Sequence, residues 1–160
     1  MPDASPFIRR AEADDVPAMH AMHLASIRAF CAGHYGPEQL NAWTQCITPE
    51  AYLAGMERLD VRVAVRAGTM LGLCITDASE RAVKALYVAP EAAGTGVGRA
   101  LLDHAEGLLM DAGARVAAVE STLNAVGFYA ANGYGRVADT VFTLPDGIAL
   151  PCVRMEKVLG

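Results

Sequence analysis

Three glycines at alternate positions, Gly94, Gly96 and Gly98, separate an apolar segment that ends at Val88 from a run with helical periodicity. Glycine has no Cβ, so a backbone rich in it can approach a ligand closely. The first N–H groups of the following helix have no partner within the helix and carry partial positive charge. Together these features predict a strand, a phosphate-binding loop and a helix, in that order.

Two other glycine-rich phosphate loops do not match this segment. A Walker loop needs Gly-Lys followed by Ser or Thr, whereas Gly98 is followed by Arg99 and Ala100. A dinucleotide fingerprint spaces its third glycine one residue later and lies tight against its strand, whereas residues 90–93 intervene here. A glycine-rich turn that caps a helix and binds nothing stays open as the simpler alternative.

The residues Leu86-Tyr87-Val88-Ala89-Pro90 and Ala93-Gly94-Thr95-Gly96-Val97-Gly98 resemble the acetyl-CoA loop of the GCN5-related N-acetyltransferases (GNAT). That loop reads Arg/Gln-x-x-Gly-x-Gly/Ala, and Ala93 stands where the family usually has Arg or Gln. Residues 124–134, with Asn124, Phe128-Tyr129 and Gly133-Tyr134, resemble the family's later Asn-x-x-x-Phe-Tyr motif. Because two motifs occur in the right order, the chain is identified as similar to bacterial members of unassigned substrate. The resemblance extends from about Phe7 to Val158 and is weakest in the N-terminal third.

The resemblance implies acetyl-CoA as co-substrate, with no metal. In this family the strand before the glycine loop and the next strand splay apart, and the pantetheine arm enters the gap between them. The positions that would bind acetyl-CoA by this resemblance are Leu86, Tyr87, Val88, Ala93, Gly94, Thr95, Gly96, Val97, Gly98, Arg99, Asn124 and Phe128. Asn124 has an alternative role as the N-cap of the following helix.

The resemblance also implies that the amine attacks the thioester directly and that Tyr129 is the general acid. A phenol with a pKa of about 10 stays protonated at neutral pH and can donate its proton to the departing sulfur. The strand before the glycine loop lacks the glutamate that family members often place there. Glu120 and His34 are therefore candidate bases, as are Glu80 and Asp77, and water-mediated deprotonation stays open.

The remaining histidines and cysteines do not indicate a metal site or a nucleophilic thiol. His20 and His23 are three residues apart, but no cysteine or acidic spacing completes a metal site with His34. Cys31 near His34 lacks the orienting group that a nucleophile needs. Four scattered cysteines and an N-terminus without an apolar h-region favour reduced thiols and a cytoplasmic protein.

Composition limits the partners. A net charge of −5 argues against a nucleic-acid ligand, and no apolar run approaches the roughly 18 residues that a membrane span needs. A local backbone cradle can still bind an anionic cofactor. A homodimer is suggested by the resemblance alone, with the last strands around Phe142 and Val153 as candidate contacts.

Hydrophobic periodicity predicts one α+β domain over residues 1–160, with a mostly antiparallel mixed sheet and helices on both faces. Helices are expected at 16–30, 38–45, 48–56, 98–111 and 125–131, the first capped by Asp14 or Asp15. Strands are expected at 7–10, 61–65, 70–76, 81–88, 115–121, 134–143 and 152–157. The order agrees with the GNAT fold.

The sequence and the resemblance together favour an N-acetyltransferase that uses acetyl-CoA to modify a primary amine of a small molecule or peptide. Two alternatives stay open: a non-catalytic acyl-CoA-binding or sensor module, and an enzyme that uses longer acyl-CoA. Acceptor specificity is expected in the N-terminal helices and the last strands, with Tyr35, Leu40 and Trp43 as candidate walls of the acceptor pocket.

Overall fold

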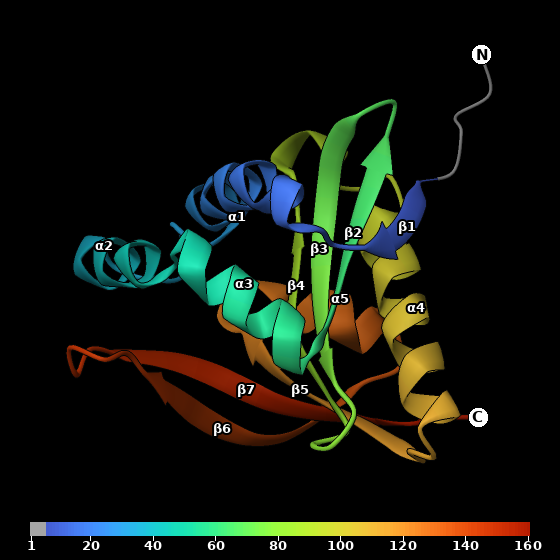
Figure 1. The fold of residues 1–160 in the computed structure, drawn as a ribbon. Helices are drawn as coiled ribbons and strands as arrows, with labels where there is room; N and C mark the ends of the chain where they lie inside the picture. Colours follow the sequence, from blue (N-terminus) through green and yellow to red (C-terminus); the bar gives the residue numbers. More distant parts are fainter. Residues whose placement is uncertain (1–5) are drawn as a thin grey trace.

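The computed structural model describes residues 6–160, so the first five residues of the expected domain lie outside the described residues. One seven-stranded sheet, in the order β1-β2-β3-β4-β5-β7-β6, forms the middle of the molecule (Figure 1). All neighbouring strands are antiparallel except β4 and β5. The strands are β1 (Phe7–Arg10), β2 (Asp60–Arg66), β3 (Thr69–Asp77), β4 (Ala82–Val88), β5 (Val116–Thr122), β6 (Gly135–Thr143) and β7 (Ala149–Val158).

Helices cover both faces of this sheet. They are α1 (Val16–Phe30), α2 (Pro37–Cys46), α3 (Pro49–Arg58), α4 (Val97–Asp111) and α5 (Val126–Ala131), with single 3-10 turns at Ala13–Asp15, Pro90–Ala92 and Leu123–Ala125. A Cβ on Gly72 of β3 would lie 2.8 Å from Leu101 of α4, so α4 packs directly on that face. On the other face the Tyr87 ring of β4 lies 4.0 Å, centroid to centroid, from His23 of α1.

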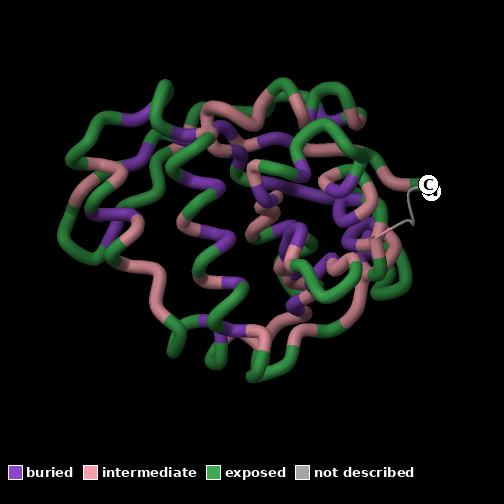
Figure 2. Tube along the Cα trace, turned by 90° about the horizontal axis from the view of Figure 1, so that it is seen from above, coloured by how far each residue is buried: buried purple, intermediate pink, exposed green. Residues whose placement is uncertain are grey.

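The main core lies between these layers, and a smaller apolar cluster stands beside it. The main core joins α1 and α4 to the central strands through fully buried residues such as Met19, Leu73 and Leu101. The smaller cluster packs α2 against the end of α1 and the β6–β7 connection. Buried positions lie on the inner sides of the helices and along the central strands, with exposed turns outside them (Figure 2). The smaller cluster places α2 over one end of the sheet.

The parallel pair β4 and β5 separates after two residue pairs. Only Ala82 pairs with Ala118 and Val83 with Val119, whereas each strand continues beside its other neighbour. A register shift between β3 and β4 leaves Lys84 as an extra residue at the position where the strands part. Because a bulge bends its strand, this extra residue accounts for the departure of β4 from β5. The splay expected from the resemblance is present in the structure.

Most expected elements match to within two residues, but two helix caps differ. Asp15 does not cap α1 with its side chain; it binds Arg9 at 2.7 Å and accepts a hydrogen bond from the Glu12 backbone. Asn124 is not the N-cap of α5, because a 3-10 turn precedes that helix and directs the amide elsewhere. The last strand begins at Ala149 rather than at Cys152. No helix within residues 6–160 is long and apolar enough to cross a membrane.

Candidate functional site

Two cavities of similar size meet where β4 and β5 part. One, of about 440 Å³, lies beside the glycine loop and the start of α4. The other, of about 460 Å³, lies between β4, β5, β7 and the end of α2. Tyr87 and Thr122 line both cavities, so the cavities adjoin where the strands separate. We call the first the loop cavity and the second the strand cavity.

The glycine loop leaves open space at the start of α4. Gly94 and Gly96 have φ values of +75° and +90°, in the left-handed region that favours glycine. A Cβ at either residue would meet no atom within 4 Å. The first backbone hydrogen bond of α4 runs from Ala100 N to Gly96 O. The preceding N–H groups at residues 97–99 therefore have no backbone acceptor in the described chain and are available to an anion.

Gly98 has a different role from the other two glycines. A Cβ there would lie 3.2 Å from the Phe128 ring and 3.4 Å from Val88. The missing side chain therefore lets α4 approach α5 and the end of β4 closely. The first turn of α4 and the Phe128 ring are held together beside the opening between the strands.

Tyr129 lies in the wall of the loop cavity, where the sequence places the general acid. Its ring is 4% exposed and packs edge-on against Phe128, with ring centroids 5.1 Å apart. Burial raises the pKa of the phenol above its ordinary value. The hydroxyl therefore stays protonated over the neutral range and is available as a proton donor.

Asn124, Cys31 and His34 lie together on the α1 side of the loop cavity. The Cys31 thiol donates a hydrogen bond to Asn124 Oδ1 over 3.3 Å. Burial raises the pKa of this thiol to about 11, so it stays protonated and is not an activated nucleophile. His34, considered as a base on the acceptor side, instead lines the cavity beside the glycine loop.

The structure places the other predicted loop residues as follows. Leu86, Tyr87, Val88, Ala93, Arg99 and Phe128 line the loop cavity together with the three glycines. Val97 is fully buried in the core, so only its backbone can face a ligand. Thr95 turns its hydroxyl back to the Ala92 carbonyl and does not line the cavity. Sequence reasoning missed Ser26, Phe30 and Thr122, which no local motif marks.

These features fit a coenzyme A thioester. The free N–H groups and the open glycines suit a pyrophosphate. Beyond Val83 no strand pairs with the β5-facing edge of β4 in the described chain. Backbone groups on that edge are therefore open to an amide-bearing arm such as pantetheine. The thioester would then end near Tyr129 and the opening to the strand cavity.

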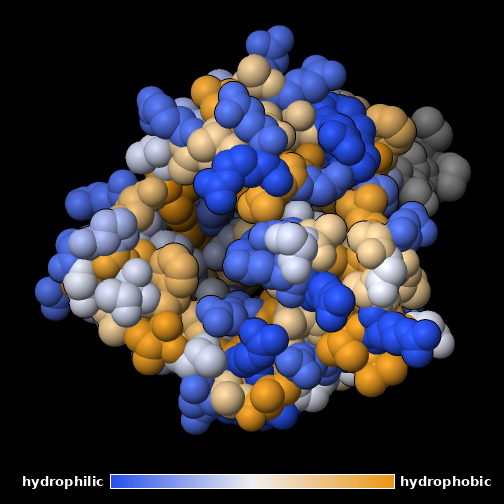
Figure 3. Space-filling view, turned by 60° about the horizontal axis from the view of Figure 1, so that its bottom comes forward, coloured by the Kyte–Doolittle hydropathy of each residue, from blue (hydrophilic) through white to orange (hydrophobic). Residues whose placement is uncertain are grey.

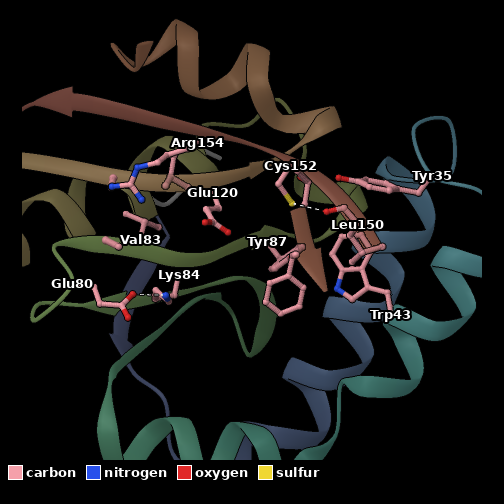
Figure 4. Close-up of a pocket in the computed structure, with 15 residues that line it drawn as sticks. Tyr35, Trp43, Glu80, Val83, Lys84, Tyr87, Glu120, Leu150, Cys152 and Arg154 are labelled. Carbon is pink, nitrogen blue, oxygen red and sulfur yellow. Dashed lines mark hydrogen bonds and ion pairs between the residues drawn. The ribbon is translucent and has the colours of Figure 1, made fainter. Parts of the chain in front are cut away.

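The strand cavity is lined by side chains from five elements, the β3–β4 turn and the loop before α2 (Figure 4). Its aromatic residues are Tyr35, Trp43, Tyr87 and Phe142, its larger aliphatic residues are Leu150, Val83 and Val119, and its charged residues are Glu80, Lys84, Glu120 and Arg154. Tyr35 and Trp43 are therefore in the wall as expected, but Leu40 is not. The face of the molecule in Figure 3 is hollowed, with hydrophobic residues on one side of the hollow and hydrophilic residues on the other.

The candidate bases differ in their surroundings. Glu80 forms an ion pair with Lys84 at the mouth of the strand cavity. Asp77 lies outside the cavity and accepts hydrogen bonds from Ser79, which hold its pKa below the ordinary value. Glu120 has no ion pair or hydrogen bond with any side chain among the described residues, and Figure 4 shows it between β4 and β5. Of the three acids, Glu120 is the one free to receive an amine.

The histidines do not form a metal site. His20 binds the Ile47 carbonyl at 3.0 Å, and His23 Nδ1 lies 2.7 Å from the Tyr52 hydroxyl. Residues 6–160 contain no group of three histidine, cysteine or acidic side chains placed to hold a metal ion. A dimer contact is expected from the last strands around Phe142 and Val153. Phe142 is 51% exposed, whereas Val153 is 2% exposed and belongs to the core. The dimer contact stays a prediction.

Comparison with known proteins identifies the family. A family model described as the acetyltransferase (GNAT) domain matches residues 31–159. No curated protein sequence matches. A GCN5-related N-acetyltransferase from Rhodopseudomonas palustris superposes with a TM-score of 0.91 at 27% identity, with 99% of both chains covered.

Two other similar structures contain coenzyme A or acetyl-CoA. The PaiA N-acetyltransferase of Thermoplasma acidophilum, in complex with coenzyme A, has a TM-score of 0.75 at 22% identity, covering 97% of this chain and 99% of that one. YncA of Salmonella typhimurium, a putative acetyltransferase with acetyl-CoA, has a TM-score of 0.70 at 20% identity, covering 98% of this chain and 95% of that one. The family model, the fold and the glycine loop agree: the chain belongs to the GCN5-related N-acetyltransferase family.

Proposed function

We propose that this protein transfers an acetyl group from acetyl-CoA directly to a primary amine of a small molecule or peptide. The observation that carries the proposal is the meeting of two cavities at one opening. The loop cavity has the backbone features that suit CoA, and the strand cavity has a free carboxylate. A thioester entering from one side and an amine from the other would meet where the strands part, which aligns the reactants.

The chemistry then assigns a task to each side of the opening. An ammonium group loses one proton to become the nucleophile, and in this proposal Glu120 receives that proton. The amine nitrogen forms the new C–N bond and releases a second proton as the C–S bond breaks. The sulfur gains one proton from the Tyr129 hydroxyl. One of the two protons released by the amine nitrogen then returns to the phenol oxygen. The overall change is ammonium plus thioester to amide, thiol and one proton.

Ligand-dependent unfolding tests the cofactor half of this proposal. At about 100 times its dissociation constant a ligand adds roughly 2.7 kcal/mol to the free energy of unfolding. Thermal unfolding should therefore shift upward by several degrees with acetyl-CoA and with CoA, and not with ATP or NAD. A shift with ATP or NAD alone would contradict the assignment of the loop.

Product formation tests the catalytic half. Incubation with acetyl-CoA and a panel of primary amines should release free thiol and give acetylated amine by mass spectrometry. Stabilisation by acetyl-CoA without turnover of any amine would favour the non-catalytic acyl-CoA-binding module, which Ala93 in the loop also suits. Faster turnover with succinyl-CoA or longer acyl-CoA than with acetyl-CoA would correct the acyl group and leave the acceptor chemistry in place.

A further inference from the structure

The strand cavity is divided into an aromatic end and a charged end. Trp43 of α2, Tyr87 and Leu150 form the aromatic end, with Tyr35 behind them. Phe142 also lines the cavity and is the β6 partner of Leu150. Glu80, Lys84 and Arg154 form the opposite end, and Glu120 lies between the two (Figure 4). A cavity of about 460 Å³ is within the range of small-molecule sites. Its division indicates an acceptor with two chemically different parts.

The charges of the strand cavity leave one carboxylate without a partner. Lys84 forms an ion pair with Glu80, and Arg154 forms one with Glu156 over 3.1 Å. Both cations therefore already face a carboxylate. Glu120 faces Arg154 across the β5–β7 ladder, yet it forms no ion pair with any described residue. The cavity therefore offers a place for one positive charge and no free cation for a negative one.

Glu120 stands beside the opening through which the acetyl group would arrive. Val119 is the last residue of β5 that pairs with β4, so Glu120 is the first residue past the point where these two strands separate. Thr122, which lines both cavities, is two residues further on the same face of β5. Two residues span about 7 Å of strand, so an ammonium group at Glu120 lies about one side chain from the opening.

The aromatic end is fixed in place before any ligand binds. The Tyr35 hydroxyl donates to the Pro151 carbonyl at 2.6 Å and accepts a hydrogen bond from Leu123 N at 3.1 Å. The Trp43 ring stands edge-on to Tyr35, with centroids 5.6 Å apart, and is 8% exposed. A rigid aromatic wall favours a flat apolar group, because little side-chain freedom is lost on binding.

We infer that the acceptor is an aromatic monoamine of the arylalkylamine class, with its ammonium group at Glu120 and its ring against Trp43 and Phe142. The inference rests on the proposed function. A polyamine or aminoglycoside would bring further positive charges beside Lys84 and Arg154. A free amino acid would place its carboxylate next to that of Glu120, whereas the corresponding amide would not.

A set of acceptors tests this inference directly. With acetyl-CoA at saturation, kcat/KM for phenethylamine, tryptamine and phenylalanine amide should be at least about tenfold above that for spermidine, kanamycin or free phenylalanine, a difference of about 1.4 kcal/mol. Preference for spermidine, kanamycin or free phenylalanine overturns the inference and leaves the proposed function standing. If no amine is acetylated although acetyl-CoA stabilises the protein, the proposed function itself fails.

Matched variants test the two ends separately. Phe142→Ala should raise KM for phenethylamine several-fold, whereas Val141→Ala should not. Both side chains are more than half exposed on β6, but Phe142 alone lines the cavity. Because neither residue supports the core, both variants are expected to fold. Equal KM values for the two variants would overturn the placement of the ring.

A second pair of variants tests the charged contact at Glu120. Glu120→Gln should raise KM for phenethylamine about tenfold or more and leave the acetyl-CoA dissociation constant unchanged. Glu57→Gln removes the same charge from an exposed position on α3 and should change neither the KM for phenethylamine nor the acetyl-CoA dissociation constant. An unchanged KM in Glu120→Gln would overturn the placement of the ammonium group.

Discussion

The two cavities that meet between β4 and β5 have nearly equal volumes but are built in opposite ways. The loop cavity owes its fit to CoA to backbone: two glycines with positive φ, a helix start with free N–H groups, and a strand edge that has no partner strand within residues 6–160. The strand cavity owes its chemistry to side chains that lie as far apart in sequence as Tyr35 and Arg154.

This difference determines how easily each cavity can change by substitution. A backbone cradle depends on glycine spacing and on where a helix begins, so few residues can change without losing the ligand. A wall of side chains can be altered one position at a time while strands and helices stay in place. In this chain the loop cavity is therefore set by the local fold, and the strand cavity is set by individual residues.

The largest expected effect concerns the opening between the two cavities. Tyr129→Phe removes the proposed proton donor while keeping the ring that packs on Phe128. We expect kcat to fall about 100-fold or more, which is typical of a lost general acid, with little change in acetyl-CoA affinity. Steady-state kinetics and a binding titration measure the two quantities separately.

Tyr134→Phe is the matched control for this change. Tyr134 is also 4% exposed and packs 5.5 Å from Tyr129, but its hydroxyl donates to Glu106 and it lines neither cavity. Its loss should lower the free energy of unfolding by about 1–3 kcal/mol and leave kcat near the parent value. Equal kcat losses in both variants would show that Tyr129 acts through packing.

A smaller effect is expected at the glycine loop. Gly96→Ala adds a methyl group where the backbone has φ +90° and where the ligand would approach. Gly113→Ala adds the same group at φ +91°, at the far end of α4. Both should lose about 1–2 kcal/mol of stability, because the left-handed conformation disfavours a Cβ.

Acetyl-CoA affinity separates these two glycine variants. Gly96→Ala should weaken binding about tenfold or more, which corresponds to about 1.4 kcal/mol, and Gly113→Ala should leave the dissociation constant unchanged. Isothermal titration of both proteins at the same temperature makes the comparison. Equal affinities would mean that the loop does not approach the ligand.

The same contrast explains what the sequence could predict. The helices and strands follow hydrophobic periodicity, and the loop cavity follows a motif of adjacent residues, so both could be read before the structure. Tyr129 is part of such a motif. The bulge at Lys84 could not be predicted from the sequence, because its effect depends on the pairing of β4 with β3 on one side and with β5 on the other.

The strand cavity was largely beyond sequence reasoning. Phe142, Leu150 and Arg154 lie on two strands whose alternation shows which side chains share a face, but not what that face meets. His34 illustrates the difficulty: its loop follows α1, and only the packing of α1 on β4 brings it to the glycine loop rather than to the acceptor. Asn124 likewise turned to Cys31 because a 3-10 turn preceded α5.

His23 offers a test of the wall behind Tyr87, one of the two residues that line both cavities. Its side chain is 8% exposed, its ring lies tilted against Tyr87 and its Nδ1 is hydrogen-bonded to Tyr52, while its Nε2 has no hydrogen-bond partner within residues 6–160. Burial and the nearby His20 lower the pKa of His23 to about 3, from an ordinary value of 6.5. The unfolded chain therefore binds a proton between these pH values that the folded protein does not bind.

Because the unfolded state binds more protons, this contribution to stability is complete above about pH 6.5 and is lost as the pH falls toward 3. From pH 7 to pH 5.5 the free energy of unfolding should fall by about 1 kcal/mol through His23 alone. His23→Gln should be less stable at neutral pH, and its free energy of unfolding should change less over this pH range than that of the parent protein. Urea unfolding at both pH values gives the slopes. If His23→Gln kept the full acid dependence, His23 would not be neutral in the wall, and Tyr87 would rest on a charged ring.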